Sequence, residues 1–248
     1  MPPHPSTTPH WLTPDLLSEV RSDFAVLEVL PDAIFDRLLA RALKLIDDKD
    51  FYGAGGLELD EGHHLAIALL GALPILELGE DWYDGFSSLV IYPGEFVTEI
   101  EEMDEDGLMH TGRDIRAGES WQGGPVVLAL SDVFDSGQGS GFNVVIHELA
   151  HQLDGLNGDT DGFPPLHRDM DPARWTEVFT RAYEELNRQL DAGQQPTFDP
   201  YGAESPAEFF AVACELYFDL PGWMAEVHPE LFAQLHAFFR WHPPLEIR

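Results

Sequence analysis

Residues 141–155 read GFNVVIHELAHQLDG, and this stretch says more about the fold than any other part of the chain. Apolar residues run through it between glycines at both ends, which predicts a buried helix. Positions four apart on a helix lie on one face, about 40° from each other around the axis. His147 and His151 therefore face the same side from adjacent turns, with Glu148 beside them. A buried helix should not carry these polar groups unless something satisfies them.

His147, Glu148 and His151 fit the His-Glu-x-x-His pattern of zinc hydrolases. In that pattern the two imidazoles bind one zinc ion, and the glutamate is a general base toward water at the metal. With 11 His and 22 Glu in 248 residues, about 0.04 chance matches to the pattern are expected. The stretch therefore predicts a Zn²⁺ site on this helix.

A catalytic zinc site needs a third protein ligand and an open position for water. The extended pattern with a third histidine fails, because Asn157 stands where that histidine would be. A glutamate on a later helix is the alternative, and the chain offers Glu204, Glu208 and Glu215. Glu208 is also the last residue of a capping box that begins at Ser205, so spacing alone does not decide whether Glu208 is a zinc ligand or a helix cap. Glu215 lies about two turns further along the same face, where a salt bridge is the simpler role, and Glu204 precedes the helix and should be exposed.

The composition limits the classes of partner. The chain has 13 Lys and Arg against 45 Asp and Glu, for a net charge of −32. Nucleic acid and anionic membrane surfaces are poor partners for such a chain. An excess of acid with few lysines also suits a high-salt cytoplasm, which is a hypothesis that retained fold and activity at molar salt would support. The content of 44% hydrophobic residues is enough to build a sizeable core.

Cysteine usage and the apolar runs point to a cytoplasmic enzyme. Cys214 is the only cysteine, which rules out an intramolecular disulfide and a multi-cysteine zinc site. Residues 1–14 have no basic region followed by an apolar run, so we expect no signal peptide. The longest apolar stretch, residues 65–76, is too short to span a bilayer and contains Pro74. We therefore expect no membrane segment.

Hydrophobic periodicity and turn residues predict the order of elements. Helices are expected at 32–48, 61–73, 172–191, 205–220 and 229–240, strands at 86–92, 96–100 and 123–130, and irregular segments at 52–56, 101–106 and 135–141. Helices, then strands, then helices indicate an α+β fold. We expect a flexible tail over residues 1–13, a sheet-containing lobe to about residue 160, a hinge at 156–171, and a helical lobe over about 170–248.

Several separated runs resemble the Mlc titration factor A (MtfA) family of zinc metallopeptidases. They are DWYDGF at 81–86, YPGEF at 92–96, HELAHQLD at 147–154, PYGA at 200–203 and PAEFFA at 206–211. The resemblance covers about residues 51–239 and is far more specific than the His-Glu-x-x-His pattern alone. It implies one zincin-like, gluzincin-like catalytic domain over residues 14–248, with a small sheet lobe, an active-site helix and a helical C-terminal lobe.

The resemblance also implies roles for single residues. The third zinc ligand falls on Glu208, beside His147 and His151, and Glu148 is the general base of peptide-bond hydrolysis. Tyr201, seven residues before Glu208, falls on an active-site tyrosine that would hydrogen-bond the oxyanion. Without the resemblance, Tyr201 is more simply a loop tyrosine. Aminopeptidase and endopeptidase activity both stay open.

Two other functions remain as alternatives. The family is named for binding the glucose repressor Mlc, so the resemblance also implies a protein that sequesters a transcriptional repressor, with peptidase activity secondary. The general base Glu148 favours catalysis, because a pure binding protein has no need for it. A structural zinc site would need a fourth protein ligand, and none is evident in the sequence.

Two further segments keep two interpretations each. Asp154 lies on the ligand face of the predicted helix, where it could hydrogen-bond a ligand imidazole or form a salt bridge elsewhere. Residues 126–130 could be an edge strand that pairs with an extended peptide, or an ordinary core strand.

Overall fold

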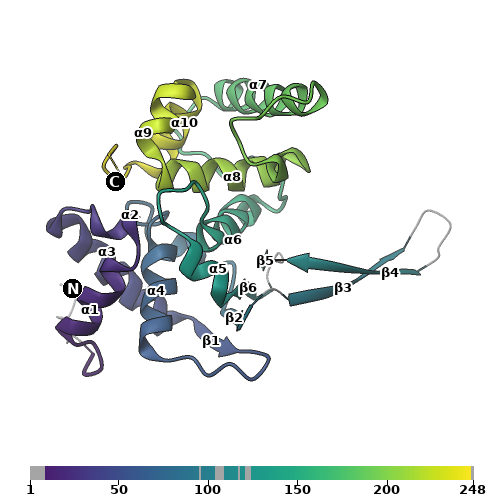
Figure 1. The fold of residues 1–248 in the computed structure, drawn as a ribbon. Helices are drawn as coiled ribbons and strands as arrows, with labels where there is room; N and C mark the ends of the chain where they lie inside the picture. Colours follow the sequence, from purple (N-terminus) through teal and green to yellow (C-terminus); the bar gives the residue numbers. More distant parts are fainter. Residues whose placement is uncertain (1–8, 95, 104–108, 117, 121–123, 247–248) are drawn as a thin grey trace.

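The computed structural model describes residues 9–94, 96–103, 109–116, 118–120 and 124–246, and it has the α+β architecture expected from the sequence (Figure 1). The helices are α1 (Pro14–Ser22), α2 (Ala25–Glu28), α3 (Asp32–Asp48), α4 (Glu61–Ala72), α5 (Leu130–Asp135), α6 (Val144–Asp154), α7 (Pro172–Asp191), α8 (Pro206–Asp219), α9 (Pro221–Val227) and α10 (Pro229–Phe239). Short 3-10 turns are η1 (Glu80–Tyr83), η2 (Gly155–Asn157) and η3 (Pro200–Ala203). The strands are β1 (Asp50–Gly53), β2 (Ser88–Tyr92), β3 (Phe96–Met103), β4 (Met109–Arg116), β5 (Gly118–Ser120) and β6 (Val126–Ala129).

The main sheet has the strand order β1-β2-β6-β5. Strands β1, β2 and β6 are parallel, with Leu89 opposite Val126, whereas β5 runs antiparallel to β6. Strands β3 and β4 form a separate antiparallel hairpin, which extends away from the rest of the chain in Figure 1. Because β6 pairs on both sides, it is a core strand, and residues 126–130 do not form the edge strand that was one of their two interpretations.

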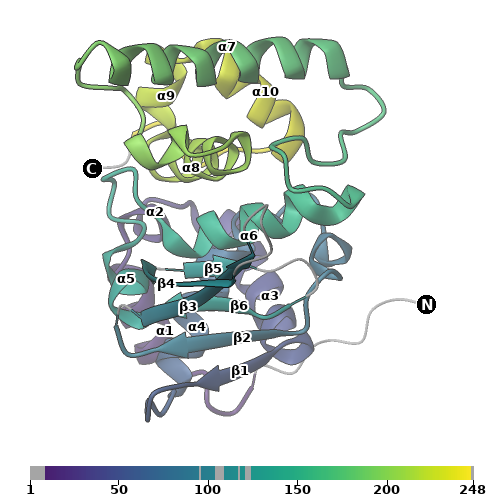
Figure 2. The same ribbon diagram turned by 90° about the vertical axis from the view of Figure 1, so that its right-hand side faces the viewer.

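Helix α6 lies between two layers of structure (Figure 2). On one side are the main sheet and the N-terminal helices, and on the other are α7 to α10. Helix α6 contacts α4, β5 and β6 on the first side and α8 on the second. One continuous hydrophobic core includes residues from both layers. The predicted active-site helix is therefore held on two sides.

A glycine allows α4 to approach α6 closely. A Cβ atom at Gly71 would lie 2.8 Å from Cδ1 of Leu149, which is nearer than side chains tolerate. The carbonyl of Gly71 accepts a hydrogen bond of 2.9 Å from the buried hydroxyl of Tyr83. Helix α4 is buried from Leu65 to Ala72 and packs against α6.

Some predicted elements differ from those observed. Helices α3 and α7 have the predicted bounds, but the predicted break at 52–56 overlaps β1, and the predicted acidic loop at 101–106 begins within β3. The predicted strand at 123–130 ends earlier, because Leu130 starts α5. Helices α1, α2, α5 and α9 and strands β4 and β5 had no counterpart among the predicted elements. Of the predicted tail, residues 1–8 lie outside the described part of the chain, and Leu12 packs against the core.

Among the described residues, every helix is too short or too polar to cross a membrane.

Candidate metal centre

Helix α6 starts from a fixed turn. The side chain of Asn143 accepts a hydrogen bond of 3.1 Å from the amide of Ile146, which makes it the N-cap. The hydroxyl of Ser136 accepts a bond of 3.0 Å from the amide of Val144. Gly141 has a φ of +89°, and a Cβ there would lie 2.9 Å from a methyl group of Leu216. The turn before α6 therefore meets α8 at a position whose backbone conformation and close approach favour glycine.

Helix α8 starts where it can face α6. The hydroxyl of Ser205 accepts a bond of 3.2 Å from the amide of Glu208, and Pro206 occupies the first turn. The segment after α6 passes close to this point, because a Cβ at Gly162 would lie 2.5 Å from the carbonyl oxygen of Pro206. The carboxylate of Asp154, at the end of α6, accepts a bond of 2.7 Å from the amide of Gly162. The end of α6 is thus tied to the start of α8.

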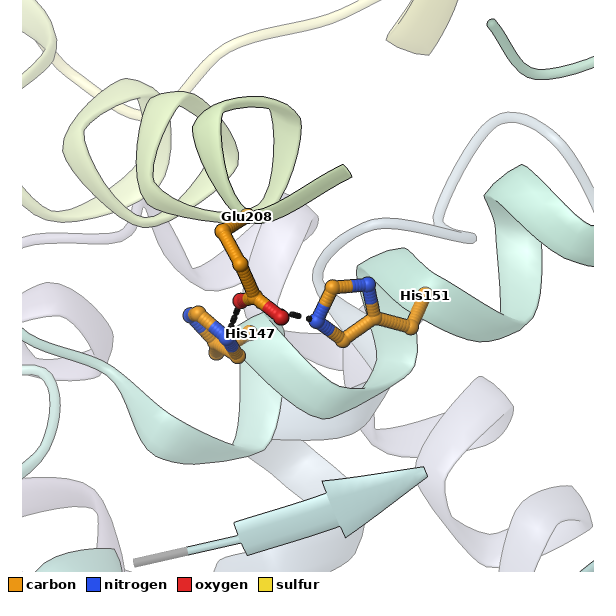
Figure 3. A group of neighbouring side chains, drawn as sticks. All are labelled: His147, His151 and Glu208. Atoms are coloured by element: carbon orange, nitrogen blue, oxygen red, sulfur yellow. Dashed lines mark hydrogen bonds and ion pairs between the residues drawn. The ribbon is translucent and has the colours of Figure 1, made fainter. Parts of the chain in front are cut away.

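This arrangement brings three predicted ligands together. Oε2 of Glu208 lies 3.0 Å from Nε2 of His147 and 3.3 Å from Nε2 of His151 (Figure 3). The three atoms lie within 4.8 Å of one another and make up the one group in the described part of the chain with the composition of a metal site. The carboxylate of Glu208 therefore faces the histidines, and of the predicted capping box the structure shows the bond that the Glu208 amide donates to the hydroxyl of Ser205.

The donor set fits a zinc ion. Tetrahedral zinc with bonds of about 2.0–2.2 Å separates its ligand atoms by about 3.4 Å. The two separations from Glu208 to the imidazoles, 3.0 and 3.3 Å, differ from this value by a few tenths of an ångström. Two imidazole nitrogens and one carboxylate oxygen are also the ligand types of catalytic zinc sites. The two separations that involve Glu208 are therefore close to those between ligand atoms on one zinc ion.

The charges around the site favour a cation. Burial lowers the pKa of His147, but the carboxylates of Glu208 and Glu215 outweigh it and raise that pKa well above its ordinary value. Burial raises the pKa of Glu208, but hydrogen bonds from His147 and His151 outweigh it and lower that pKa well below its ordinary value. The site therefore stabilises positive charge close to an ionised carboxylate.

Glu215 holds His147 from behind. Its Oε1 accepts a bond of 2.7 Å from Nδ1 of His147, and its Oε2 accepts a bond of 2.6 Å from the amide of Asn143. Burial, partly offset by His147, raises the pKa of Glu215. A carboxylate in this position fixes the tautomer and the orientation of the imidazole, so that the electron pair of Nε2 can be offered to a metal. The sequence predicted a salt bridge for Glu215, and the structure shows that its partner is His147. The identity of the partner depends on the packing of two helices and could not be predicted from the sequence.

The remaining candidates lie around the three-residue group. Glu148 is buried, with 4% exposure, whereas Tyr201 is 42% exposed, with its ring centre 5.7 Å from that of His147. Glu204 is exposed and lies outside the group of possible ligands. Asp154 accepts a hydrogen bond from the amide of Gly162. Its Oδ1 and the Nδ1 of His151 both lack a hydrogen-bond partner among the described residues. Of the two interpretations of Asp154, the bond to the imidazole of a predicted ligand is therefore not formed.

A cavity of about 560 Å³ opens beside the candidate ligands. His147, Glu148, Tyr201 and Glu215 contribute to its wall, whereas His151 and Glu208 do not, so the cavity extends from the His147 side of the group. The turn before α6 forms another part of the wall, and Asp219 on α8 fixes this turn by accepting bonds from the amides of residues 139 and 141. A molecule in the cavity would therefore lie beside both His147 and Glu148.

Comparison with known proteins gives one consistent result. The sequence profile of the glucose-regulated metallopeptidases M90 matches residues 6–240. A protein of Escherichia fergusonii named Mlc titration factor A is 40% identical over 214 residues, which cover 86% of this chain and 81% of that protein. Proteins of the same name from Salmonella agona and Salmonella arizonae are 39% identical over 214 residues, covering 81% and 85% of their own lengths.

Proposed function

Because this chain belongs to the glucose-regulated metallopeptidase M90 family, we propose that it is a zinc-dependent peptidase whose metal is held by His147, His151 and Glu208. The observation that carries the proposal is the convergence of these three donor atoms beside a buried glutamate and an open cavity. Zinc, when bound there, polarises a peptide carbonyl and lowers the pKa of water toward about 7.

The residues of the chain then divide the remaining work. Glu148 takes the proton from the attacking water and passes it to the leaving amine nitrogen, for which a buried carboxylate at the cavity wall is well placed. Tyr201 donates a hydrogen bond to the carbonyl oxygen as negative charge develops on it, a contact typically worth about 3 kcal/mol. Glu215 keeps Nε2 of His147 directed toward the metal.

The first test measures metal content and peptide hydrolysis on the same samples. We expect roughly one zinc per chain in the wild type, and loss of both zinc and hydrolysis in Glu208→Ala. Glu184→Ala is the matched control, because Glu184 is an exposed glutamate on α7. Full zinc retention in Glu208→Ala would return Glu208 to a capping role and reopen the identity of the third ligand.

Two variants separate the catalytic roles from metal binding. Glu148→Gln should keep the zinc and lose hydrolysis, because an amide cannot accept the proton. Tyr201→Phe should keep the zinc and lower kcat about 10²- to 10³-fold. An active Glu148→Gln protein would contradict the assignment of the general base.

The cellular setting is part of the proposal. The single cysteine, Cys214, is buried and has no cysteine in the chain to pair with, which suits a reducing compartment such as the cytoplasm. Peptides or proteins of that compartment would be the substrates. The preference between amino-terminal and internal peptide bonds is a question for product analysis.

A second candidate function is the binding of a transcriptional repressor. It is favoured by the name of the relatives, Mlc titration factor A, at 39–40% identity over most of their length. Glu148→Gln distinguishes the two functions, because it should abolish hydrolysis and leave repressor binding intact. Zinc without hydrolysis of any peptide, together with tight binding of an Mlc-type repressor, would favour this second function.

A further inference from the structure

The cavity beside the candidate metal centre has walls of two kinds. Its polar residues include His147, Glu148, Asp199, Tyr201, Glu204 and Glu215. Its apolar residues come from four separate parts of the chain, namely the turn that leads into α6, residues 196–198, α8 with Leu220 at its end, and α9. They include Phe142, Val144, Phe198, Val212, Leu216, Leu220 and Trp223.

The apolar residues form a floor and a rim. Val144, Val212 and Leu216 are buried, with exposures of 3%, 3% and 7%, and form the floor. Phe142 and Trp223 form the rim and remain exposed, at 38% and 36%. Large aromatic side chains left open beside a catalytic group gain free energy when a ligand covers them.

The charged groups of the wall argue against an acidic occupant. Four carboxylates line the cavity, those of Glu148, Asp199, Glu204 and Glu215, and no lysine or arginine lines it among the residues that the structure describes, so an acidic side chain would meet repulsion. The carboxylate of Glu215 already accepts a hydrogen bond from the amide of Asn143, and that of Asp199 accepts one from the amide of Tyr201. The apolar floor would leave the charge of a basic side chain without water.

We propose that this cavity binds a bulky, uncharged apolar side chain, such as Phe or Leu, of the substrate residue next to the cleaved bond. The inference rests on the proposed peptidase function, because it uses the position of Glu148 and His147 at one end of the cavity. A peptide bond held at that end places its neighbouring side chain over the apolar floor. The cavity volume of about 560 Å³ is ample for one aromatic side chain and its backbone.

The test measures binding separately from turnover. Zinc-loaded Glu148→Gln protein is titrated by calorimetry with short peptides that carry Phe, Ala, Lys or Glu on either side of one central bond. One or more buried methylene groups usually change discrimination by about 10- to 200-fold. We therefore expect at least tenfold tighter binding of a Phe peptide than of the Ala peptide, and the weakest binding for Glu.

Variants in the same background locate the preference in the cavity. Trp223→Ala at the rim and Leu216→Ala at the floor should each reduce the preference for Phe over Ala severalfold. Val227→Ala is the matched control, because Val227 is an apolar residue of the same helix α9, is 41% exposed and does not line this cavity. It should leave the preference unchanged.

Each result is decisive for one of the two proposals. Equal binding of the Phe and Ala peptides, or tighter binding of the Lys peptide, would overturn the inference about the cavity. A preference that survives both Trp223→Ala and Leu216→Ala in folded protein would also overturn it. Failure of the wild type to hydrolyse any of the peptides, despite selective binding, would instead count against the proposed peptidase function.

Discussion

Glu215→Gln is the substitution that tests the metal centre most directly. The two carboxylate oxygens of Glu215 accept separate bonds, of 2.7 Å from Nδ1 of His147 and of 2.6 Å from the amide of Asn143. A glutamine has one acceptor oxygen, so its NH₂ group must face one of these two donors. The variant therefore loses either the support of the ligand imidazole or that of the residue capping α6.

The expected cost follows from the kind of bond lost. Removing a partner that supports a ligand histidine typically weakens metal binding by about 10- to 100-fold, which corresponds to about 1.4–2.7 kcal/mol. A buried hydrogen bond to a charged group is worth a similar amount, about 1.5–3 kcal/mol. We expect the zinc Kd of Glu215→Gln to rise within that range and hydrolysis at saturating zinc to be partly retained.

The assay is zinc competition with a chelator of known affinity, followed by peptide hydrolysis at saturating zinc. Glu215→Asp keeps both acceptor oxygens and should recover part of the zinc affinity, whereas a general loss of structure would not be rescued in this way. Glu184→Gln on the exposed face of α7 controls for loss of one negative charge. A wild-type zinc Kd in Glu215→Gln would refute the role assigned to Glu215.

Three further predictions concern stability. Burial raises the pKa of Asp154 to about 6, against about 3.9 in an unfolded chain, so the metal-free protein loses stability as the pH rises from about 4 to 6. Asp154→Asn should therefore be more stable than wild type by up to about 3 kcal/mol near pH 8 and no different below about pH 4. Equal denaturation midpoints of the two proteins at both pH values would contradict this prediction. Gly162→Ala places a Cβ 2.5 Å from a carbonyl oxygen, whereas Gly158→Ala, also at positive φ, meets no atom within 4 Å; calorimetry should show a midpoint at least about 2–4 °C lower for Gly162→Ala than for Gly158→Ala. The net charge of −32 repels itself, and the screening length falls to about 3 Å at 1 M salt, so the thermal midpoint should rise from low to molar salt with activity retained, and inactivation at molar salt would argue against the high-salt hypothesis.

The helices that position the site could be predicted because their signals are local. The pattern of His147, Glu148 and His151 needs only helical spacing, and α3 and α7 have clear apolar periodicity. Glu208 could not be assigned from spacing alone, because its sequence context fits a helix cap equally well. The resemblance to a family singled it out, and the structure shows its carboxylate facing the two histidines.

The parts that could not be predicted depend on packing between distant segments. The role of Glu215 requires α8 to lie across α6, which no local pattern encodes. The apolar cavity is assembled from four segments, and each contributes side chains that look like ordinary core or surface residues in the sequence. Helix α2, of four residues, and strand β5, of three, were missed because such short elements carry too few residues for a clear period.

Helix α8 has a mechanical consequence for the whole site. Glu208, Glu215 and Asp219 are spaced by seven and then four residues, so they form a single stripe along the helix. Along this stripe the first residue faces the two histidines of the candidate metal centre, the second holds the imidazole of His147, and the third fixes the turn that borders the cavity. A sliding or rotation of α8 would displace all three residues together. Such a movement would therefore change the candidate metal centre and the shape of the cavity at the same time.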